Sequence, residues 1–416
     1  MHQTAALRQL LRIAVRNVRA NGRRALLAGL AVLLGVAAVT SLRGMLNGVQ
    51  RSLRGEAIDS QVGALQVHRT GYMNQVFGTP LDLDMPADPA FLQRMAAVPN
   101  VRGVAPRIQF GSLVAVGDVT TFAMMMAIDP EREATVCPLR ADRLSSGALV
   151  DRQHPDRLVL SAELARRLGA KVGPGDTGRV ALLTNDKDGS LNAIDTRLSG
   201  LNGLPRSPGL ETRLGVVGLS QAQELLRMPG RATEIALSVD DLTQLEPTRQ
   251  ALRQLLGKDY EVSTWPELAK MVADATALQD QIFGVVMAIL LVVALVGVVN
   301  TMLMSVLERT REIGVMLALG MKTRAIALLF VLEAAVINFF AALPGLALAA
   351  VVLAIARKAD VQFQAPGGGV LHIQPELALA DVVLVLAVVQ VGAVLAAVLP
   401  ALRAAQLRPV EALSSV

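Results

Sequence analysis

Residues 282–324 read IFGVVMAILLVVALVGVVNTMLMSVL followed by ERTREIGVMLALGMKTR, and this stretch decides the fold. Its first part, residues 282–307, contains no charged residue and is longer than the roughly 20 apolar residues that span the hydrocarbon core of a bilayer. Three other apolar blocks of membrane-spanning length, or nearly so, lie at residues 25–42, 325–356 and 379–402. The sequence therefore predicts four transmembrane helices.

The stretch between the first two blocks, residues 43–281, has the ordinary polar composition of a soluble domain. Short apolar runs alternate there with turn residues, which is typical of a mixed α and β domain. We expect strands within 62–67, 101–116, 216–219 and 234–239, helices at 91–97, 162–168 and 245–256, and a long loop at 185–213. The expected fold class is an integral membrane α-helical protein, with four transmembrane helices per protomer and a large α+β domain between helices 1 and 2.

The first apolar block is expected to be a retained helix, although a cleavable signal peptide is the alternative. The block runs directly into a helical pattern that continues to Glu56, whereas the apolar core of a signal peptide is shorter and ends at a cleavage site. A helix from Ala25 to Glu56 would be roughly 48 Å long, against about 30 Å of hydrocarbon. Because residues 267–281 continue the second block in the same way, we expect two helical stalks that carry the domain.

Arginine placement gives the expected orientation. The first 24 residues contain six arginines and no acidic residue, so the positive-inside rule places the N-terminus in the cytoplasm. Four crossings then place residues 43–281 and 357–378 outside, with Arg357 and Lys358 as an exception to the rule. Residues 5–20 predict a basic amphipathic helix, which lies on the inner leaflet or packs on a cytoplasmic partner.

These patterns divide the chain into nine segments. They are a cytoplasmic amphipathic helix (1–24), transmembrane helix 1 with its stalk (25–56), the extracytoplasmic α+β domain (57–266), a stalk with transmembrane helix 2 (267–307), a cytoplasmic coupling loop (308–324), transmembrane helix 3 (325–356), an outer loop (357–378), transmembrane helix 4 (379–402) and a cytoplasmic tail (403–416).

Several kinds of chemistry lack a signature in the sequence. The segment Gly173–Val180 lacks the lysine and the Ser/Thr that a phosphate-binding loop needs, so ATP would have to be hydrolysed by a partner. The four histidines are isolated from one another, which predicts no metal site, and the single Cys137 excludes an internal disulfide. Few aromatic residues accompany the net charge of +5, so we expect no nucleic-acid binding. No catalytic residue is predicted.

Three polar residues interrupt the apolar blocks: Asn300, Glu333 and Asn338. Polar side chains at membrane depth face protein or water and are candidates for function. For Glu333 the alternatives are a relay and, favoured here, a structural bond to a neighbouring helix or a position near the inner interface. Pro344-Gly345 is expected to kink or interrupt the third helix.

The segment ERTREIGVMLALG at residues 308–320 resembles the signature of FtsX-like permeases, the MacB/Lol-type class of ABC transporters. Three further segments are similar to that family: RNVRANGRRALLAGLAVLLGVA before and within the first block, LVLSAELARRLGAKVGPGD in the outer domain, and LPALRAAQLRPVEAL at the C-terminal end. The resemblance therefore covers nearly the whole chain. RIQFGSLVAVGDVTTFAMMMAIDPERE resembles the lipoprotein-releasing LolC/LolE branch more than the macrolide-efflux branch.

The resemblance implies a bacterial inner-membrane protein that crosses the membrane several times, with both termini cytoplasmic. It implies a dimer of permeases, with the same or a homologous chain as the second copy, bound to a cytoplasmic ABC ATPase dimer. ATP and Mg would bind to that ATPase, with no cofactor on this chain. The short helix of the inner loop would dock on the ATPase, which makes Arg311, Glu312, Ile313, Gly314 and Gly320 the candidate coupling residues. From the residues alone, the alternative is an interfacial turn that lies on lipid.

The expected activity is mechanotransmission, in which ATP hydrolysis by the partner moves the stalks and the outer domain. Lipoprotein release from the inner membrane is the leading interpretation, and the alternatives are MacB-like efflux of peptides or small molecules, FtsX-like signalling to a periplasmic hydrolase, and a membrane enzyme. The acyl chains and membrane lipids would contact the first two helices. The candidate substrate-facing residues there are Leu42, Met45, Leu46, Ile282 and Val286.

Overall fold

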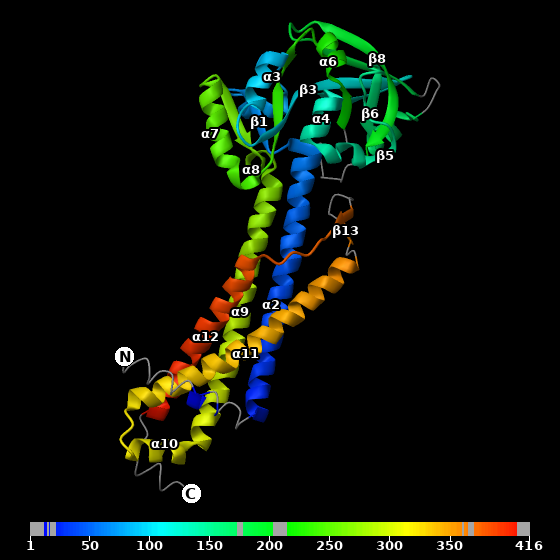
Figure 1. The fold of residues 1–416 in the computed structure, drawn as a ribbon. Coiled ribbons are helices and arrows are strands. Elements are labelled where there is room, and N and C mark those ends of the chain that lie inside the picture. Colours follow the sequence, from blue (N-terminus) through cyan, green and yellow to red (C-terminus); the bar gives the residue numbers. More distant parts are fainter. Residues whose placement is uncertain are drawn as a thin grey trace. The chain divides into compact units, whose positions relative to one another are not determined.

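The computed structural model describes residues 12–14, 16, 22–172, 178–202, 214–359, 362–364 and 370–405. Its contacts divide the chain into two units (Figure 1). The helical unit contains residues 1–50, 276–361 and 373–416, and the α/β unit contains residues 51–275 and 362–372. Each unit is described on its own.

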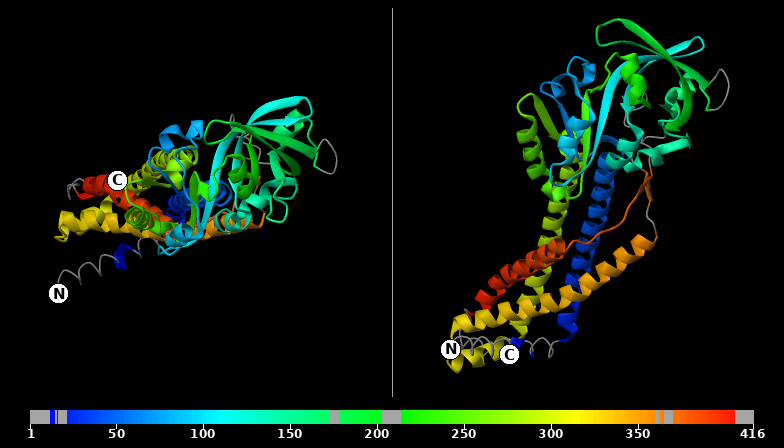
Figure 2. Two further views of the ribbon diagram at one scale, coloured as in Figure 1. Left: turned by 90° about the horizontal axis from the view of Figure 1, so that it is seen from above. Right: turned by 45° about the horizontal axis from the view of Figure 1, so that its top comes forward.

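The helical unit is built on four long helices, α2 (Gly22–Ala57), α9 (Lys270–Glu308), α11 (Thr323–Lys358) and α12 (Leu379–Ala405). All four are long and apolar enough to cross a membrane, which agrees with the four helices predicted from hydropathy. Helices α2 and α9 each continue past the boundary of this unit into the α/β unit. Helix α11 packs along α12, as the two views of Figure 2 show.

Small side chains let the helices approach closely. Gly345 of α11 lies against α2, where an added Cβ would meet the Leu33 carbonyl oxygen at 2.7 Å and the Val36 Cβ at 3.1 Å. Helix α11 continues through Pro344 without interruption, so the alternative of a broken helix is wrong. Membrane helices tolerate an internal proline because neighbouring helices and local adjustments satisfy the freed backbone groups.

The α/β unit is organised by one ten-stranded sheet with the order β12-β1-β11-β3-β4-β9-β6-β8-β5, in which β7 pairs with both β3 and β8. Its strands are β1 (Leu65–Arg69), β3 (Val101–Val116), β4 (Val119–Ile128), β5 (Leu144–Gly147), β6 (Arg157–Ser161), β7 (Arg179–Asn185), β8 (Leu191–Asn202), β9 (Leu214–Gly218), β11 (Glu234–Val239) and β12 (Tyr260–Thr264). Two short pairings complete the described strands: β2 (Met85–Pro86) with β10 (Arg231–Ala232), and β13 (Gln362–Gln364) with β14 (Val370–His372).

Strand β3 runs through both halves of this unit. On one side it joins the closed ring of pairings β3-β4-β9-β6-β8-β7, whose interior is filled by apolar side chains and covered by α5 (Ala162–Leu168) and α6 (Leu219–Leu225). On the other side it pairs with β11, and a second apolar core lies between β1, β11, β12, α3 (Pro89–Ala96) and α7 (Leu245–Leu256). The two largest cores of the unit therefore share one strand.

The end of α2 leads into the α/β unit through a π-helical turn, η1 (Ile58–Val62), and Gly63 then ends it with a φ of +78°. Two 3-10 helices, η2 (Met73–Gly78) and η3 (Pro138–Arg143), and the helix α4 (Pro130–Val136) follow later in the chain. The stalk before α9 begins with the short helix α8 (Trp265–Leu268). A 3-10 turn, η6 (Leu242–Gln244), precedes α7.

One expectation for this unit is wrong: residues 185–213 do not form a single loop, because residues 191–202 are strand β8. The Asn, Asp, Gly and Ser residues of this segment are typical of loops and led to the wrong prediction. Burial alternates along it as in a strand: Thr196 and Leu198 are buried, while Asp195 and Arg197 are exposed. Two other predicted features, the amphipathic segment 5–20 and the C-terminal tail, lie largely outside the described residues.

Candidate functional site

The segment that carries the family signature forms a separate short helix, α10 (Thr310–Ala318), between α9 and α11. The side-chain hydroxyl of Thr310 donates to the carbonyl oxygen of Leu307 at 2.7 Å, which fixes the turn out of α9. At the other end Gly320 adopts a φ of +88°, and the amide of Met321 donates to the carbonyl oxygen of Met316 at 3.0 Å. This is the bonding expected of a glycine-capped C-terminus.

Two of the predicted coupling residues face the helical unit. Ile313 is fully buried against Val306, Ile326 and Phe330, and Gly314 beside it is also buried. Their contacts fix α10 on the ends of α9 and α11. These two residues therefore support the helix, and their surfaces do not face outward for a partner.

An ion-pair chain fixes the start of α10. The Arg309 guanidinium lies 2.9 Å from the Glu312 carboxylate and 3.4 Å from the carboxylate of Glu333 on α11. Glu333 is buried, so its charge needs this partner. The structure thus supports the structural interpretation of Glu333, which ties the third transmembrane helix to the loop that carries α10.

The opposite face of α10 is exposed. Arg311, Val315 and Leu319 follow one another at intervals of four residues, and Leu319 is 83% exposed. Glu312 and Gly320 are exposed beside them. We call Arg311, Glu312, Val315, Ala318 and Leu319 the outer face of α10. It combines two charges with an apolar stripe, and exposed apolar patches of this kind mark sites that contact a protein partner or a membrane.

An apolar cavity of about 40 Å³ lies between α2, α9, α11 and α12. The residues that line it include Val32, Val36 and Val39 of α2, Met287 and Leu290 of α9, Asn338 of α11 and Val389 of α12. Since about 10–15 Å³ of such space holds one water molecule, the cavity has room for only a few waters.

The five predicted substrate-facing residues do not line this cavity. Leu46 packs against the helix core, while Leu42 and Ile282 are exposed on the surface of the helical unit; Met45 and Val286 are half-buried. The cavity is lined instead by residues closer to the middle of the apolar blocks 25–42 and 282–307. Of the polar residues, Asn338 is buried and its amide donates to the Ala334 carbonyl oxygen at 2.9 Å, whereas Asn300 is exposed.

Charged residues at the edges of the apolar blocks form a second tie that the sequence did not reveal. Arg43 of α2 lies 2.6 Å from Asp280 of α9 and 3.0 Å from Asp381 of α12. Asn47 donates to the same Asp381 carboxylate at 2.6 Å. Three helices are therefore joined at one level. The sequence signal was a single charged residue at the edge of each block, but nothing in it shows that the three meet.

Among the described residues no group of His, Cys, Asp or Glu is arranged to hold a metal ion.

Comparison with known proteins identifies both halves of the chain. Residues 25–255 match the family model of the MacB-like periplasmic core domain, and residues 284–409 match that of the FtsX-like permease C-terminal region. A macrolide export ATP-binding/permease protein MacB from Nitrobacter winogradskyi is 26% identical over 92% of this chain and 56% of its own length. A lipoprotein-releasing system transmembrane protein LolC from Xylella fastidiosa is 24% identical over 76% of this chain and 78% of its own.

Two further comparisons cover smaller parts. The pyoverdine export ATP-binding/permease protein PvdT of Pseudomonas putida is 35% identical over 44% of this chain, which spans 27% of that protein. The crystal structure of the periplasmic region of MacB from Actinobacillus actinomycetemcomitans aligns with a TM-score of 0.37 and 13% identity, over 52% of this chain and 95% of that one. The chain thus spans about a quarter of PvdT and a little over half of the Nitrobacter MacB.

More than half of the residues match the periplasmic core model, and the last two transmembrane helices and α10 lie within the permease match. The four membrane-spanning helices and the large α/β unit between the first two agree with that assignment. The chain belongs to the MacB/FtsX-type family of ABC transporter permeases.

Proposed function

We propose that this permease binds a cytoplasmic ABC ATPase on another chain through the outer face of α10 and uses its ATP cycle to do work on the far side of the membrane. The observation that carries the proposal is the construction of α10. Its inner face is fixed by Ile313 and by the Arg309–Glu333 pair, while Arg311, Val315 and Leu319 are exposed. A helix fixed on one face and exposed on the other transmits force from a partner that binds it.

The proposed orientation follows from this function. The six arginines before α2 and the basic residues around α10 place that end of the helical unit in the cytoplasm under the positive-inside rule. The α/β unit then lies on the outer side of a bacterial inner membrane, away from the cytoplasm. A second permease, identical or homologous, completes the assembly, and ATP and Mg belong to the ATPase.

The proposed cargo is a lipoprotein whose acyl chains enter between α2 and α9. The apolar lining of the seam from Val32 to Val39 and from Met287 to Val298 supports an apolar ligand, and its small volume fits a site that opens only during the cycle. LolC from Xylella fastidiosa, named for lipoprotein release, is similar over most of its own length. MacB-like export is the second candidate, because the similarity to proteins of that name covers nearly the whole chain.

Coupling is tested with Glu312→Lys in the full complex. Glu312 is exposed on the outer face of α10, and reversal of its charge should reduce both ATPase co-purification and ATP turnover. Glu163→Lys is the matched control, since Glu163 pairs with nearby arginines on α5 in the other unit. If Glu312→Lys leaves both quantities intact, the coupling assignment is wrong.

Cargo is tested by photo-cross-linking from Val36 and Leu290, which line the seam, with the exposed Leu34 and Val293 as controls. Release predicts that an acylated protein is cross-linked at the first pair and that ATP removes it. An outer-membrane channel bound to the complex would favour efflux. A soluble hydrolase bound to the α/β unit, with no cargo on the helices, would favour signalling.

A further inference from the structure

A buried cluster of charges lies at the end of the stalk helix, inside the α/β unit. The guanidinium of Arg107 on β3 donates to both carboxylate oxygens of Glu133 on α4, at 2.7 and 2.9 Å, and to the Glu234 carboxylate on β11 at 2.8 Å. The guanidinium of Arg140 on η3 donates to the same Glu133 at 2.8 Å. All four side chains are buried, and Arg107 has no exposed surface.

Both arginines also bind the end of the stalk helix. The carbonyl oxygen of Gln61, in the π-helical turn η1, accepts from Arg107 at 3.1 Å and from Arg140 at 2.8 Å. One turn earlier, the thiol of Cys137 donates to the Ile58 carbonyl oxygen at 3.3 Å. The C-terminal carbonyls of a helix lack partners within the helix and carry the negative end of its dipole, so they attract cations.

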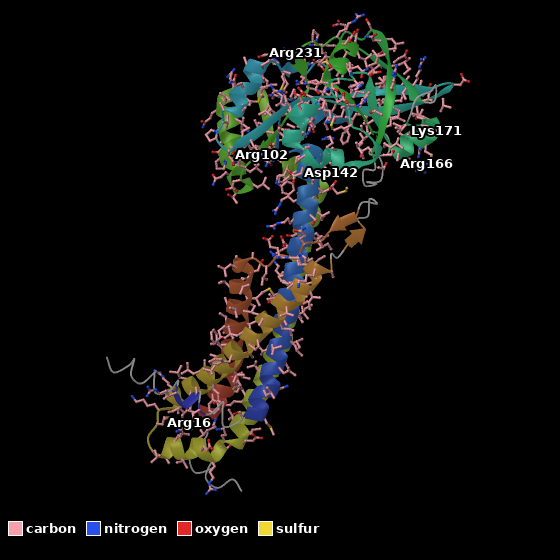
Figure 3. The ribbon with its side chains drawn as sticks, turned by 45° about the vertical axis from the view of Figure 1, so that its right-hand side comes forward. Arg16, Arg102, Asp142, Arg166, Lys171 and Arg231 are labelled. Atoms are coloured by element: carbon pink, nitrogen blue, oxygen red, sulfur yellow. The ribbon has the colours of Figure 1, made fainter. Side chains whose placement is uncertain are left out.

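Of the elements that supply these bonds, β3 contributes residues to both large cores and β11 to one of them, while α4 contributes Val136 to a smaller apolar cluster with Ala105, Cys137 and Ala236. Arg107 pairs in register with Glu234 at the point where β3 leaves β11 and enters the closed ring of strands. Helix η3 contacts η1 directly, and Asp142, labelled in Figure 3, marks its position beside the end of α2. The cluster thus joins one helix end to the strand shared by both cores.

The ionised state of the cluster is favoured despite its burial. Burial alone would raise the pKa of Glu234, but its contacts with His68 and Arg107 outweigh this and lower the pKa to about 2. Burial likewise opposes ionisation of Glu133, and the charges of Arg107 and Arg140 lower its pKa. A buried ion cluster adds little net stability compared with apolar residues of the same size. The cluster instead fixes the geometry, because charge-assisted hydrogen bonds hold the helix end in one orientation, whereas apolar contacts can slide.

We propose that Arg107, Arg140, Glu133 and Glu234 form a rigid joint that fixes the end of the first stalk helix to the outer domain, so that the domain follows every movement of this helix. This joint rests on the proposed function, because it matters only if α2 moves during the ATP cycle. The four residues are positioning residues: they act through the helix end that they hold.

The single cysteine of the chain gives the joint a native reporter. Cys137 is buried within the cluster, and burial raises the pKa of its thiol, so it should react very slowly while the joint is closed. The experiment measures maleimide labelling of Cys137 in the full complex in nanodiscs, with and without ATP. A Cys137→Ala, Ser146→Cys variant, labelled at an exposed position of β5, sets the rate for an open site.

A rigid joint predicts that wild-type Cys137 is labelled no faster during ATP turnover than without nucleotide. Arg140→Met should raise the labelling rate about tenfold or more, because loss of charge-assisted bonds favours local opening. Arg140→Lys should give an intermediate rate, since one ammonium group keeps the charge without the fork that reaches two acceptors. Arg152→Met is the matched control, because Arg152 pairs with Asp129 and Glu131 on the surface, and it should label as wild type.

The joint also predicts a loss of transmission. Arg140→Met should hydrolyse ATP at the wild-type rate but release less than half as much cargo for each ATP, and Arg152→Met should keep both. Labelling of wild-type Cys137 at the Ser146→Cys rate during turnover would overturn the proposal, and so would wild-type release by Arg140→Met. The labelling without nucleotide requires neither cargo nor ATPase, so a failed joint is distinguishable from a failed coupling assignment, which Glu312→Lys tests.

Discussion

Replacement of Leu319 by Asp tests the outer face of α10 with the least disturbance to the fold. Leu319 is 83% exposed, so nearly all of its side chain is available to a partner and none of the apolar cores loses a member. Full burial of a leucine is worth about 1.5–3 kcal/mol. If the ATPase covers it, Leu319→Asp removes roughly 2 kcal/mol from binding, which weakens the affinity about 30-fold.

The assay titrates purified ATPase onto the permease in nanodiscs and compares the dissociation constants of wild type and Leu319→Asp. Leu191→Asp is the control, because Leu191 is similarly exposed, at 72%, but lies on β8 of the α/β unit. Both variants should unfold within about 0.5 kcal/mol of wild type, as surface substitutions do. A Leu319→Asp affinity within threefold of wild type, with the ATPase still bound, would refute the assignment of this face.

Three further predictions concern the ion pair that fixes α10, the buried carboxylate Glu234 and the close approach of α11 to α2. Glu333→Gln leaves the Arg309 guanidinium without its buried carboxylate partner and should lower the free energy of unfolding by about 2 kcal/mol. Glu312→Gln removes the exposed partner and should change the free energy of unfolding little. Equal melting temperatures for the two variants would contradict this. The carboxyl group of Glu234 has an ordinary pKa of 4.5; burial would raise this pKa, but the contacts with His68 and Arg107 lower it to about 2. The lowered pKa stabilises the α/β unit by about 3 kcal/mol above pH 4.5, and this contribution is lost as the pH falls towards 2. Unfolding followed by the fluorescence of the single tryptophan should show that Glu234→Gln removes that pH dependence; an unchanged profile would count against it. Gly345→Val forces α11 away from α2 and should cost about 1–3 kcal/mol of stability. Gly284→Ala is the control and should be tolerated, because no atom lies within 4 Å of its new Cβ. A Gly345→Val protein as stable as wild type would disprove the close approach of α11 to α2.

Hydropathy predicted the membrane helices because a long apolar run has few other stable environments. The glycine at position 320 also has a local explanation, since glycine is favoured at the left-handed position that ends many helices. The direction in which each motif residue points was not accessible. Ile313 and Glu312 are neighbours in the same signature, yet one is buried and the other exposed, because the packing partners Ile326 and Phe330 come from another helix.

The long-range charge pairs could not be predicted from the sequence for a similar reason. Arg107 lies in an alternating strand pattern, where a charged side chain would ordinarily point to water, and its partners lie 26 and 127 residues away. Arg43 finds Asp381 across 338 residues. Their pairing depends on the tertiary arrangement of strands and helices, which one sequence does not specify. Resemblance to a family supplied the docking role of the loop, but not these contacts.

The most direct test of the account is ATP-driven release of a lipidated protein from proteoliposomes that contain this permease and its ATPase. We expect the acylated protein to leave the membrane only when ATP is hydrolysed, and Leu319→Asp to reduce release in step with its roughly 30-fold weaker binding of the ATPase. Release at the same rate without ATP, or sustained ATP turnover with every lipidated protein retained in the membrane, would contradict it.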